Sequence, residues 1–204
     1  MTVTKIEVIG RTKWKVELDG EFAFVLYKGE LKRFGIQEEA ELSEELYEKI
    51  RKEVILKRAK LRAMHLLTDM ARTEKNLREK LCKSLYPDDI VDAAIAYVRS
   101  FGYLDDERYA ENFIESRKHT KSRKEIYAAL LQRGVSSEEV ERAFTNCYSE
   151  EGEQEAIRKL IAKKNVDIYH ATDAELQKLY GYLARKGFRY EEIRRACQKH
   201  EQNA

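Results

Sequence analysis

Hydrophobic positions follow two different periods along this chain. Up to residue 26, β-branched and aromatic residues alternate or cluster over residues 3–9, 13–18 and 21–26, which is typical of half-buried strands. Asp19-Gly20 separates the last two segments and predicts a tight hairpin turn, because both central positions of a type I′ turn need a positive φ. A sheet this short must pack on another element. The expected cover is a helix with apolar residues spaced by four: Leu42, Leu46, Ile50 and Val54.

From residue 53 onward the period is helical, and the pattern returns at an offset of about 50 residues. Residues 73–81 resemble residues 122–130, and residues 130–143 resemble residues 183–196. Apolar positions predict three helices in each repeat, around residues 61–70, 77–81 and 90–98, then 109–114, 126–131 and 140–144, and then 156–161, 176–183 and 193–197. We therefore expect a mainly α protein with three tandem three-helix repeats in an elongated array, preceded by a small N-terminal β-hairpin and strand module.

The expected domains are residues 1–52 for the β module with its leading helix, and residues 53–104, 105–149 and 150–204 for the three repeats. Residues at the expected helix ends agree with this division. Capping boxes are predicted for three pairs: Ser122 with Glu125, Ser136 with Glu139, and Thr172 with Glu175. Gly134 and Gly187 stand where the C-terminus of a helix favours a left-handed residue.

Composition supports a helical protein and says little about partners. Among 204 residues there are 9 Gly and 1 Pro, whereas a protein built on β-turns needs many more. Lys and Arg total 39 against 37 Asp and Glu, so the net charge of +2 identifies no partner by itself. No apolar run approaches the roughly 20 residues that span a bilayer, and the N-terminus does not have the form of a signal peptide. We expect a cytoplasmic protein that does not associate with membranes.

Motifs that support enzymatic chemistry are missing. The sequence has no phosphate-binding Gly-rich loop, no H-E-x-x-H and no G-x-S-x-G. The cysteines Cys82, Cys147 and Cys197 have no C-x-x-C spacing and fall on helical patterns, so buried thiols are favoured over a disulfide or zinc. Asp105-Asp106 precedes a helix, where capping is favoured over metal binding or acid catalysis. We expect no enzymatic activity, no metal and no cofactor.

Basic residues are better candidates for function, because they recur at comparable places in each repeat. They are Lys57, Arg58, Lys60 and Arg62 in the first repeat, Arg117, Lys118, Lys121, Arg123 and Lys124 in the second, and Arg158, Lys159, Lys163 and Lys164 in the third. A basic stripe of this kind would follow a phosphate backbone, because each neutralised phosphate releases a counterion. The alternative is a solvated face without a partner, and the sequence leaves both interpretations open.

Two groups of aromatic residues could also stack bases. Trp14 with Phe22 or Phe24 could form such a surface, although filling the core of the sheet is the favoured interpretation. Residues 185–190 mix cations with aromatic rings, but Phe188 aligns with Val135 and is expected in the core.

Residues 101–110, Phe-Gly-Tyr-Leu-Asp-Asp-Glu-Arg-Tyr-Ala, closely resemble the signature of the bacterial RecX regulatory proteins, G-Y-L-[DN]-D followed by an aromatic residue and Ala. The residues that match are Gly102, Tyr103, Leu104, Asp105, Asp106, Tyr109 and Ala110. Arg72-Thr73 with Leu77 and Leu81 resembles the family's R-[ST]-x-x-x-L-x-x-x-L element, and Asp19 to Phe22 is similar to its N-terminal extension. The chain departs from the family at Leu85, where a Gly is frequent, and in an insertion-like segment at residues 165–171.

The resemblance implies a non-enzymatic modulator of the RecA recombinase, with a role in homologous recombination, DNA repair and the SOS response. It implies a protein that lodges along the RecA–single-stranded DNA filament and restrains ATP hydrolysis, strand exchange and co-protease activity. The expected partners are the RecA filament and single-stranded DNA, with weaker binding to duplex, and the expected state is a monomer.

The basic stripe is then expected to carry binding: Lys57, Arg58, Arg62, Arg72, Arg117, Lys121, Arg123, Lys124, Lys163 and Lys164. The signature residues are expected to fix the angle between repeats, with Leu104 and Tyr109 as buried anchors. The alternative function is a helix-turn-helix-like DNA-binding protein. Against that alternative, no single helix concentrates Arg, Asn and Gln as a recognition helix does.

Overall fold

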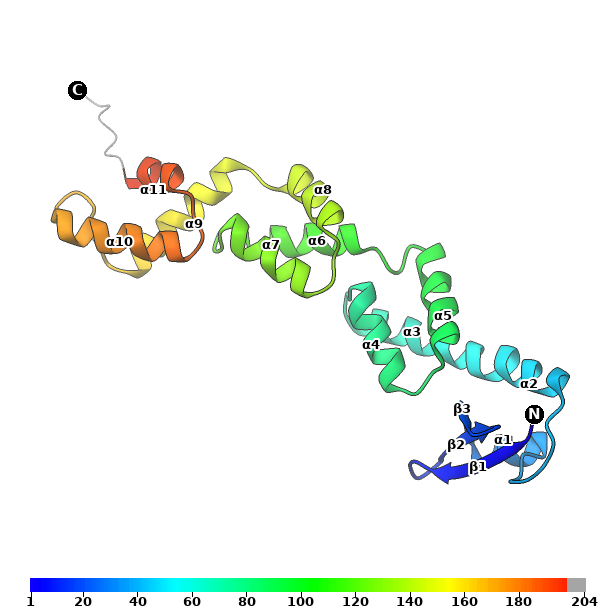
Figure 1. The fold of residues 1–204 in the computed structure, drawn as a ribbon. Coiled ribbons are helices and arrows are strands. Elements are labelled where there is room, and N and C mark those ends of the chain that lie inside the picture. Colours follow the sequence, from blue (N-terminus) through cyan, green and yellow to red (C-terminus); the bar gives the residue numbers. More distant parts are fainter. Residues whose placement is uncertain (198–204) are drawn as a thin grey trace. The chain divides into compact units, whose positions relative to one another are not determined.

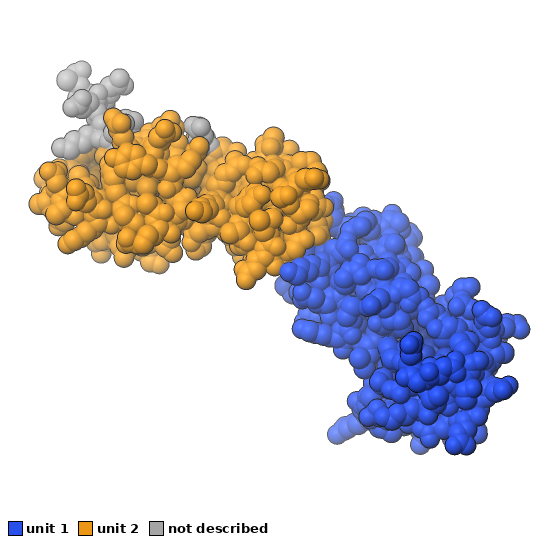
Figure 2. Space-filling view, viewed as in Figure 1, with its two compact units in different colours: residues 1–105 blue, residues 106–204 orange. Residues whose placement is uncertain are grey.

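The computed structural model describes residues 1–197, and the chain divides into two compact units, Met1–Asp105 and Asp106–Ala204 (Figure 1). Figure 2 colours the first unit blue and the second orange. Strands occur at the start of unit 1, and every later element described is a helix. The expected fold class is therefore confirmed: a mainly helical protein of three three-helix domains with an N-terminal antiparallel sheet.

The N-terminal sheet has three antiparallel strands in sequence order, β1 (Val3–Val8), β2 (Lys13–Leu18) and β3 (Glu21–Tyr27). Asp19 and Gly20 have φ values of +50° and +86°, as the predicted hairpin turn requires. Phe24 is fully buried, which confirms its place in the core, whereas Phe22 remains 38% exposed.

The sheet is followed by a short helix and then by one continuous helical segment, and the sequence did not predict all of these elements. After the short helix α1 (Lys28–Phe34), the chain forms α2 (Glu44–Ile50), the π-helix η1 (Arg51–Leu56) and α3 (Lys57–Asp69) without a break. Ile50 is fully buried, so the predicted covering helix is confirmed, but its first predicted residue, Leu42, is buried outside the helix, since α2 begins after the N-cap Ser43. The apolar pattern did not indicate α1 or the π-helical turn.

The first three-helix domain consists of α3, α4 (Glu74–Lys83) and α5 (Asp88–Ser100). Its buried residues form one continuous hydrophobic core with those of the sheet, from Val3 and Phe24 through Ile55 to Val98. Unit 1 is therefore a sheet and a helical domain that share one core.

Unit 2 contains two three-helix domains with separate cores. The second domain has α6 (Asp106–Glu115), α7 (Arg123–Gln132) and α8 (Ser137–Cys147) around Ile114, Leu130 and Phe144. The third domain has α9 (Glu150–Lys163), α10 (Asp173–Arg185) and α11 (Tyr190–Cys197) around Ile157, Leu183 and Phe188. Burial of Phe188 confirms its expected core role.

The middle helix of each domain ends in the same way. A left-handed residue stands after the helix, with φ of +60° at Leu85 and +89° at Gly134 and Gly187. The next N–H donates to the carbonyl five residues back, Tyr86 to Leu81 at 3.5 Å, Val135 to Leu130 at 3.3 Å and Phe188 to Leu183 at 3.3 Å. Leu85 thus adopts the backbone conformation of a glycine, although a Cβ is unfavourable there.

Two of the three predicted capping boxes form. Ser136 with Glu139 and Thr172 with Glu175 exchange both hydrogen bonds. The third prediction is wrong in part, because Ser122 accepts from the Glu125 N–H but the Glu125 carboxylate lies 3.5 Å from the Lys121 ammonium instead of returning to the N-cap. Competition from a nearby cation explains the difference.

Candidate functional site

Arg58 of the predicted stripe is used inside unit 1. Its guanidinium donates to the Val25 carbonyl at 3.1 Å and to the Glu30 carboxylate at 2.6 Å, and it lies 4.4 Å from the ring centroid of Tyr27. These contacts tie α3 to β3 and α1. Arg58 is therefore a structural link between the first domain and the sheet.

Arg72 likewise serves the fold. Its Nε donates to the Leu66 carbonyl at 2.9 Å and its Nη1 donates to the Asn76 side chain at 2.9 Å, which closes the end of α3 and joins it to α4. Lys57 and Arg62 differ from it, because both are exposed on α3 and form no hydrogen bond or ion pair with a described residue.

The arginines of the second domain cover aromatic rings. The Arg117 guanidinium lies 3.8 Å from the centroid of Phe113, and that of Arg123 lies 4.6 Å from Phe144 while it pairs with Glu141 at 2.7 Å. Both cations thus contribute to packing at the edge of the second core.

Arg62 and the lysines are the cations of the predicted stripe that remain at the surface without a structural role. Lys124 and Lys163 are exposed and form no ion pair with a described residue, and Lys121 makes a long, exposed pair with Glu125. Lys164 is exposed too, although its ammonium lies 4.6 Å from the centroid of Tyr182. We call the following set the exposed cations: Lys57, Arg62, Lys121, Lys124 and Lys163.

The ten predicted stripe residues therefore divide by role. Most of the arginines serve the structure because their planar guanidinium can stack and donate several hydrogen bonds at once, whereas an ammonium on a flexible stem stays hydrated. Two of the exposed cations lie in unit 1 and three in unit 2. Continuity of a single stripe stays a prediction.

The signature residues begin with a helix stop. Gly102 has φ +69°, its N–H donates to the Arg99 carbonyl at 2.9 Å, and the Tyr103 N–H donates to the Val98 carbonyl at 3.0 Å. Leu104 is 3% exposed and belongs to the core of unit 1, as predicted for a buried anchor.

The rest of the signature runs from Asp105, the last residue of unit 1, into α6 of unit 2. Asp105 directly precedes α6 and Asp106 is its first residue, where negative charge complements the helix dipole. Ala110 is fully buried, but Tyr109 is only half-buried, stacked at 6.3 Å on Phe113. A fully buried anchor at Tyr109 is thus wrong, because its ring lies at the edge of the second core.

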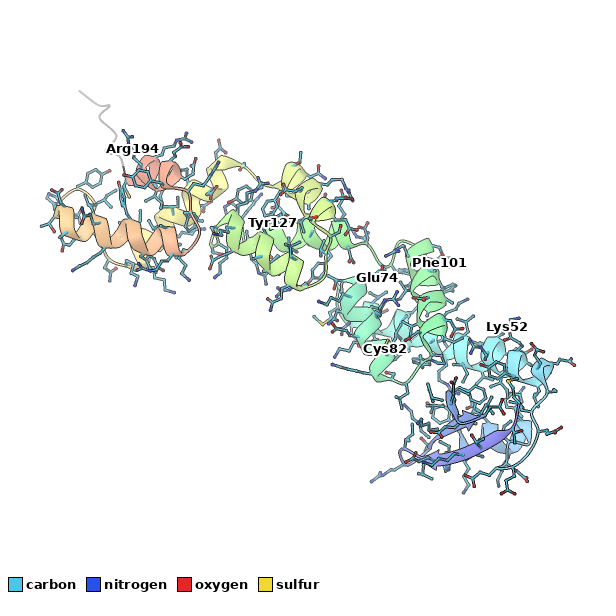
Figure 3. The ribbon with its side chains drawn as sticks, viewed as in Figure 1. Lys52, Glu74, Cys82, Phe101, Tyr127 and Arg194 are labelled. Carbon is cyan, nitrogen blue, oxygen red and sulfur yellow. The ribbon has the colours of Figure 1, made fainter. Side chains whose placement is uncertain are left out.

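Sequence reasoning missed an exposed row of aromatic rings at the end of α5. Phe101, labelled in Figure 3, lies 4.9 Å from Tyr97 and 6.2 Å from Tyr103 between ring centroids, and the Lys60 ammonium lies 4.4 Å from the Tyr97 ring. Phe101 and Tyr103 are 58% and 55% exposed. The four-residue spacing of Tyr97 and Phe101 could have indicated a shared helix face.

Sequence reasoning also missed the polar junction between the second and third domains. Ser122 is fully buried, and its hydroxyl donates to the Lys186 carbonyl at 2.7 Å. The Lys118 ammonium donates to the Cys147 carbonyl at 3.1 Å within the second domain, and the Lys118 stem lies against α9, where a Cβ added at Gly152 would be 3.7 Å from it. His119 Nδ1 lies 2.6 Å from the Glu155 carboxylate. Hydrogen bonds and charges, rather than a shared apolar core, therefore join these two domains.

Buried carboxylates lie beside this junction. Glu153 and Glu192 are each 3% exposed, and Gln154 Nε2 donates to the Glu192 carboxylate at 2.5 Å. Burial raises the pKa of Glu153, and the nearby charge of Glu192 acts in the same direction against the opposing Arg189. Burial beside Glu153 also raises the pKa of the Tyr148 phenol.

Comparison with known proteins shows what these three domains are. Family models described as the first, second and third three-helix domains of RecX match residues 59–97, 105–143 and 151–197. Regulatory protein RecX of Caldanaerobacter subterraneus subsp. tengcongensis is 34% identical over 91% of this chain and 92% of its own length. The chain belongs to the RecX family. Regulatory protein RecX of Clostridium perfringens strain SM101 is 29% identical over 93% of the chain and 91% of its own.

Solved RecX structures share the fold. A crystal structure of regulatory protein RecX superposes with a TM-score of 0.64 at 24% identity, covering 95% of this chain and 97% of its own. RecX from Lactobacillus salivarius superposes with a TM-score of 0.61 at 22% identity, covering 69% of this chain and 93% of its own. The fold of this RecX-family chain is thus also found in experimental structures.

The described part of this RecX-family chain offers no group of three or more His, Cys, Asp or Glu residues that could hold a metal ion. Its three cysteines are free and half-buried, and each packs against one of the three cores, so the prediction of buried thiols is confirmed only in part. Within residues 1–197, none of the helices combines the length and apolar character needed to cross a bilayer.

Proposed function

We propose that this RecX-family chain is a non-enzymatic modulator of the RecA recombinase. It binds along the RecA–single-stranded DNA filament and restrains ATP hydrolysis, strand exchange and co-protease activity. The observation that carries this proposal is the match to proteins named regulatory protein RecX over more than nine-tenths of both chains. It acts as a monomer in the cytoplasm and prefers single-stranded to duplex DNA.

The distribution of exposed charge supports binding to a filament that offers many phosphates and protein charges. Both units carry exposed cations, and none of these cations is held in a short ion pair with a residue that the structure describes. Contacts of this kind are individually weak because water and salt screen them. Because several three-helix domains lie on one chain, their weak contacts add: each bound domain raises the effective concentration of the next domain at the filament.

The structure also narrows which residues carry binding in this proposal. Arg58, Arg72, Arg117 and Arg123 hold helices and rings in place, so their replacement disturbs folding as well as charge. The exposed cations can be replaced without breaking a described hydrogen bond or ion pair, Lys121 excepted. They are therefore the residues with which the proposal is tested.

The first experiment measures ATP hydrolysis by RecA on single-stranded DNA, with this protein added well below one molecule per RecA protomer. Inhibition under these conditions supports binding along the filament, because one modulator then affects several protomers. A naked-DNA binding assay runs alongside. Absence of inhibition, together with sequence-dependent duplex binding, would instead support the helix-turn-helix-like function, and absence of both effects would contradict both functions.

A charge variant tests the surface itself. One variant replaces all five exposed cations by Gln: Lys57, Arg62, Lys121, Lys124 and Lys163. It is expected to bind the filament or DNA more weakly. The slope of log binding constant against log salt concentration is expected to become shallower by roughly 0.7 for each phosphate of single-stranded DNA that the variant no longer neutralises. The matched control replaces Lys28, Lys32, Lys49, Lys52 and Lys75, which are also exposed but lie outside the predicted stripe. Equal behaviour of the two variants would remove the exposed cations from the proposal.

A further inference from the structure

The third domain contains a cavity of about 300 Å³. It lies between the end of α9, the segment that follows and one face of α10. Val166, Leu179 and the ring of Tyr182 supply its apolar lining. A volume of this size stands at the lower end of small-molecule sites, which combine an apolar lining with a few placed polar groups.

Three cations surround this lining: Lys164, Lys178 and Arg185. The Lys164 ammonium already lies 4.6 Å from the centroid of the Tyr182 ring. A Cβ added at Gly181 would lie 3.4 Å from Arg185 Nη1, so this glycine lets the guanidinium rest close against α10. The site thus combines an aromatic ring with positive charge, as sites for nucleotides of single strands do.

One carboxylate also lines the pocket and limits what can enter. Glu175 Oε2 accepts from the Thr172 N–H at 2.9 Å and from its hydroxyl at 2.8 Å, and these bonds lower the pKa of Glu175. Its charge repels any anion, so a bound phosphate is favoured next to the cations Lys178 and Arg185 rather than next to Glu175. Its Oε1 has no hydrogen-bond partner among the described residues and can accept from the amino group of a base.

The pocket arises from features of the third domain. Helix α10 has 13 residues, whereas the middle helices α4 and α7 have 10 each. The insertion-like segment before it folds into a turn in which Asp167 accepts from the Tyr169 N–H at 3.0 Å and lies 2.7 Å from His170. Aligned on Gly134 and Gly187, the second domain has Ala129 and Gln132 where the third has Tyr182 and Arg185.

We propose that this pocket binds one nucleotide of single-stranded DNA, with the base against Tyr182 and the phosphate between Lys178 and Arg185. The proposal deepens the proposed function, on which it rests for the identity of the strand. The third domain then contributes a stacking contact in addition to charge. Stacking tolerates different bases because every base has a flat face.

The test measures fluorescence anisotropy of a fluorescein-labelled 20-nucleotide deoxycytidine strand with the full chain. Tyr182→Ala is expected to weaken binding about ten-fold, from the loss of one stacked base. Tyr182→Phe is expected to bind like the unaltered protein, because the ring remains. Tyr169→Ala is the matched control: Tyr169 is 56% exposed in the same domain but does not line the pocket.

A second pair of variants tests the phosphate contact. Arg185→Gln is expected to weaken binding and to reduce the salt slope by roughly 0.7, the value for one phosphate contact on a single strand. Arg194→Gln removes the same charge from an exposed position on α11 outside the pocket and the predicted stripe, and it is expected to change neither. Melting temperatures of all variants are measured, and the Phe and Gln variants keep the test valid if Tyr182→Ala unfolds.

The outcomes separate this proposal from the proposed function. Loss of strand binding in Tyr182→Ala, with rescue in Tyr182→Phe, supports the pocket even if the unaltered protein does not inhibit RecA. Unchanged strand binding in Tyr182→Ala overturns the pocket proposal, whatever happens to RecA inhibition. If inhibition alone is lost, the pocket holds a protein segment instead.

Discussion

Units 1 and 2 hold their parts together by different means. In unit 1 the sheet and the first helical domain share a single hydrophobic core that runs from Val3 to Leu104. In unit 2 the two domains have separate cores, and the junction between them is built from a buried serine, a lysine and a histidine–glutamate pair. An apolar core resists change in salt and pH, whereas a polar junction responds to both.

This difference indicates that the two units respond differently to solution conditions. Loss of apolar packing in unit 1 removes the sheet and the helical domain together, because each supplies the other's core. Loss of a polar interaction in unit 2 loosens the junction and leaves each domain its own core. Single substitutions in the two units therefore test whether the units differ in this way.

Phe24→Ala is expected to have the largest effect. Removing a fully buried ring from the shared core costs about 3–5 kcal/mol. Amide hydrogen exchange is expected to lose protection in β3 and in α5 together. If α5 kept its protection while β3 lost it, the sheet and the first domain would not form one cooperative core.

Ser122→Ala is expected to cost about 2 kcal/mol in unit 2, because it removes an N-cap and leaves the part-buried Lys186 carbonyl without this partner. Ser136→Ala is the matched control: it removes an N-cap of the same kind at an exposed position, for about 1 kcal/mol. Both costs are measured by urea denaturation, with hydrogen exchange locating the loss. Equal costs would show that the Lys186 hydrogen bond adds nothing.

Leu85→Gly is expected to stabilise unit 1 by about 0.5–1 kcal/mol. It relieves a side chain held at φ +60°, against the smaller cost of a more flexible unfolded chain. Urea denaturation of the full chain measures the gain, and hydrogen exchange in α4 locates it. A loss of stability would mean that the Leu85 side chain, 41% exposed, packs more favourably than its strain costs.

Glu153→Gln is expected to give the smallest change, one that depends on pH. Burial raises the native pKa of Glu153 above its ordinary value of 4.5, so the native state binds this proton more tightly than the unfolded state. Stability from this group is full below pH 4.5 and lost as pH rises through the raised pKa. The variant should therefore gain melting temperature at neutral pH and no advantage in acid.

Glu151→Gln is the control for that pH dependence, because Glu151 is exposed on the same helix. The groups facing Glu153 are Tyr148, Arg123, Arg189 and Glu192, and all four are unchanged in both variants. A pH-independent effect of Glu153→Gln would assign its contribution to packing or to the Arg189 pair.

Features of the fold that depend only on residues close together in the sequence were predicted well. The turn at Asp19-Gly20 depends only on the positive φ angles of these two residues. Each helix was recognised from the spacing of the apolar residues along one of its faces. Helix α1 was not predicted because it is short and has Gly29, a poor helix former, in its first turn. Its start also depends on the Glu30 carboxylate, which accepts from the Tyr27 N–H at 2.7 Å.

The role of each cation could not be predicted in the same way. Arg58 and Lys57 are neighbours in the sequence, yet one is held by Glu30 and Tyr27 and the other lies in solvent. The difference depends on which side of α3 meets the sheet, and that is a tertiary property. The pocket beside Tyr182 was equally hidden, because its lining joins Lys164 at the end of α9, Val166 of the insertion-like segment and one face of α10, which meet only in the folded chain.

The π-helical turn between α2 and α3 bears on how such a chain can change over generations. A π-turn holds an extra residue, so losing one codon within residues 51–56 would restore α-helical hydrogen bonding. A π-turn has more residues per turn than an α-helical turn, so the same loss would leave Ile50 and Ala59 both facing the core that they fill. We therefore expect related chains to tolerate both new side chains at exposed positions such as Lys52 (Figure 3) and the loss of one residue from this turn.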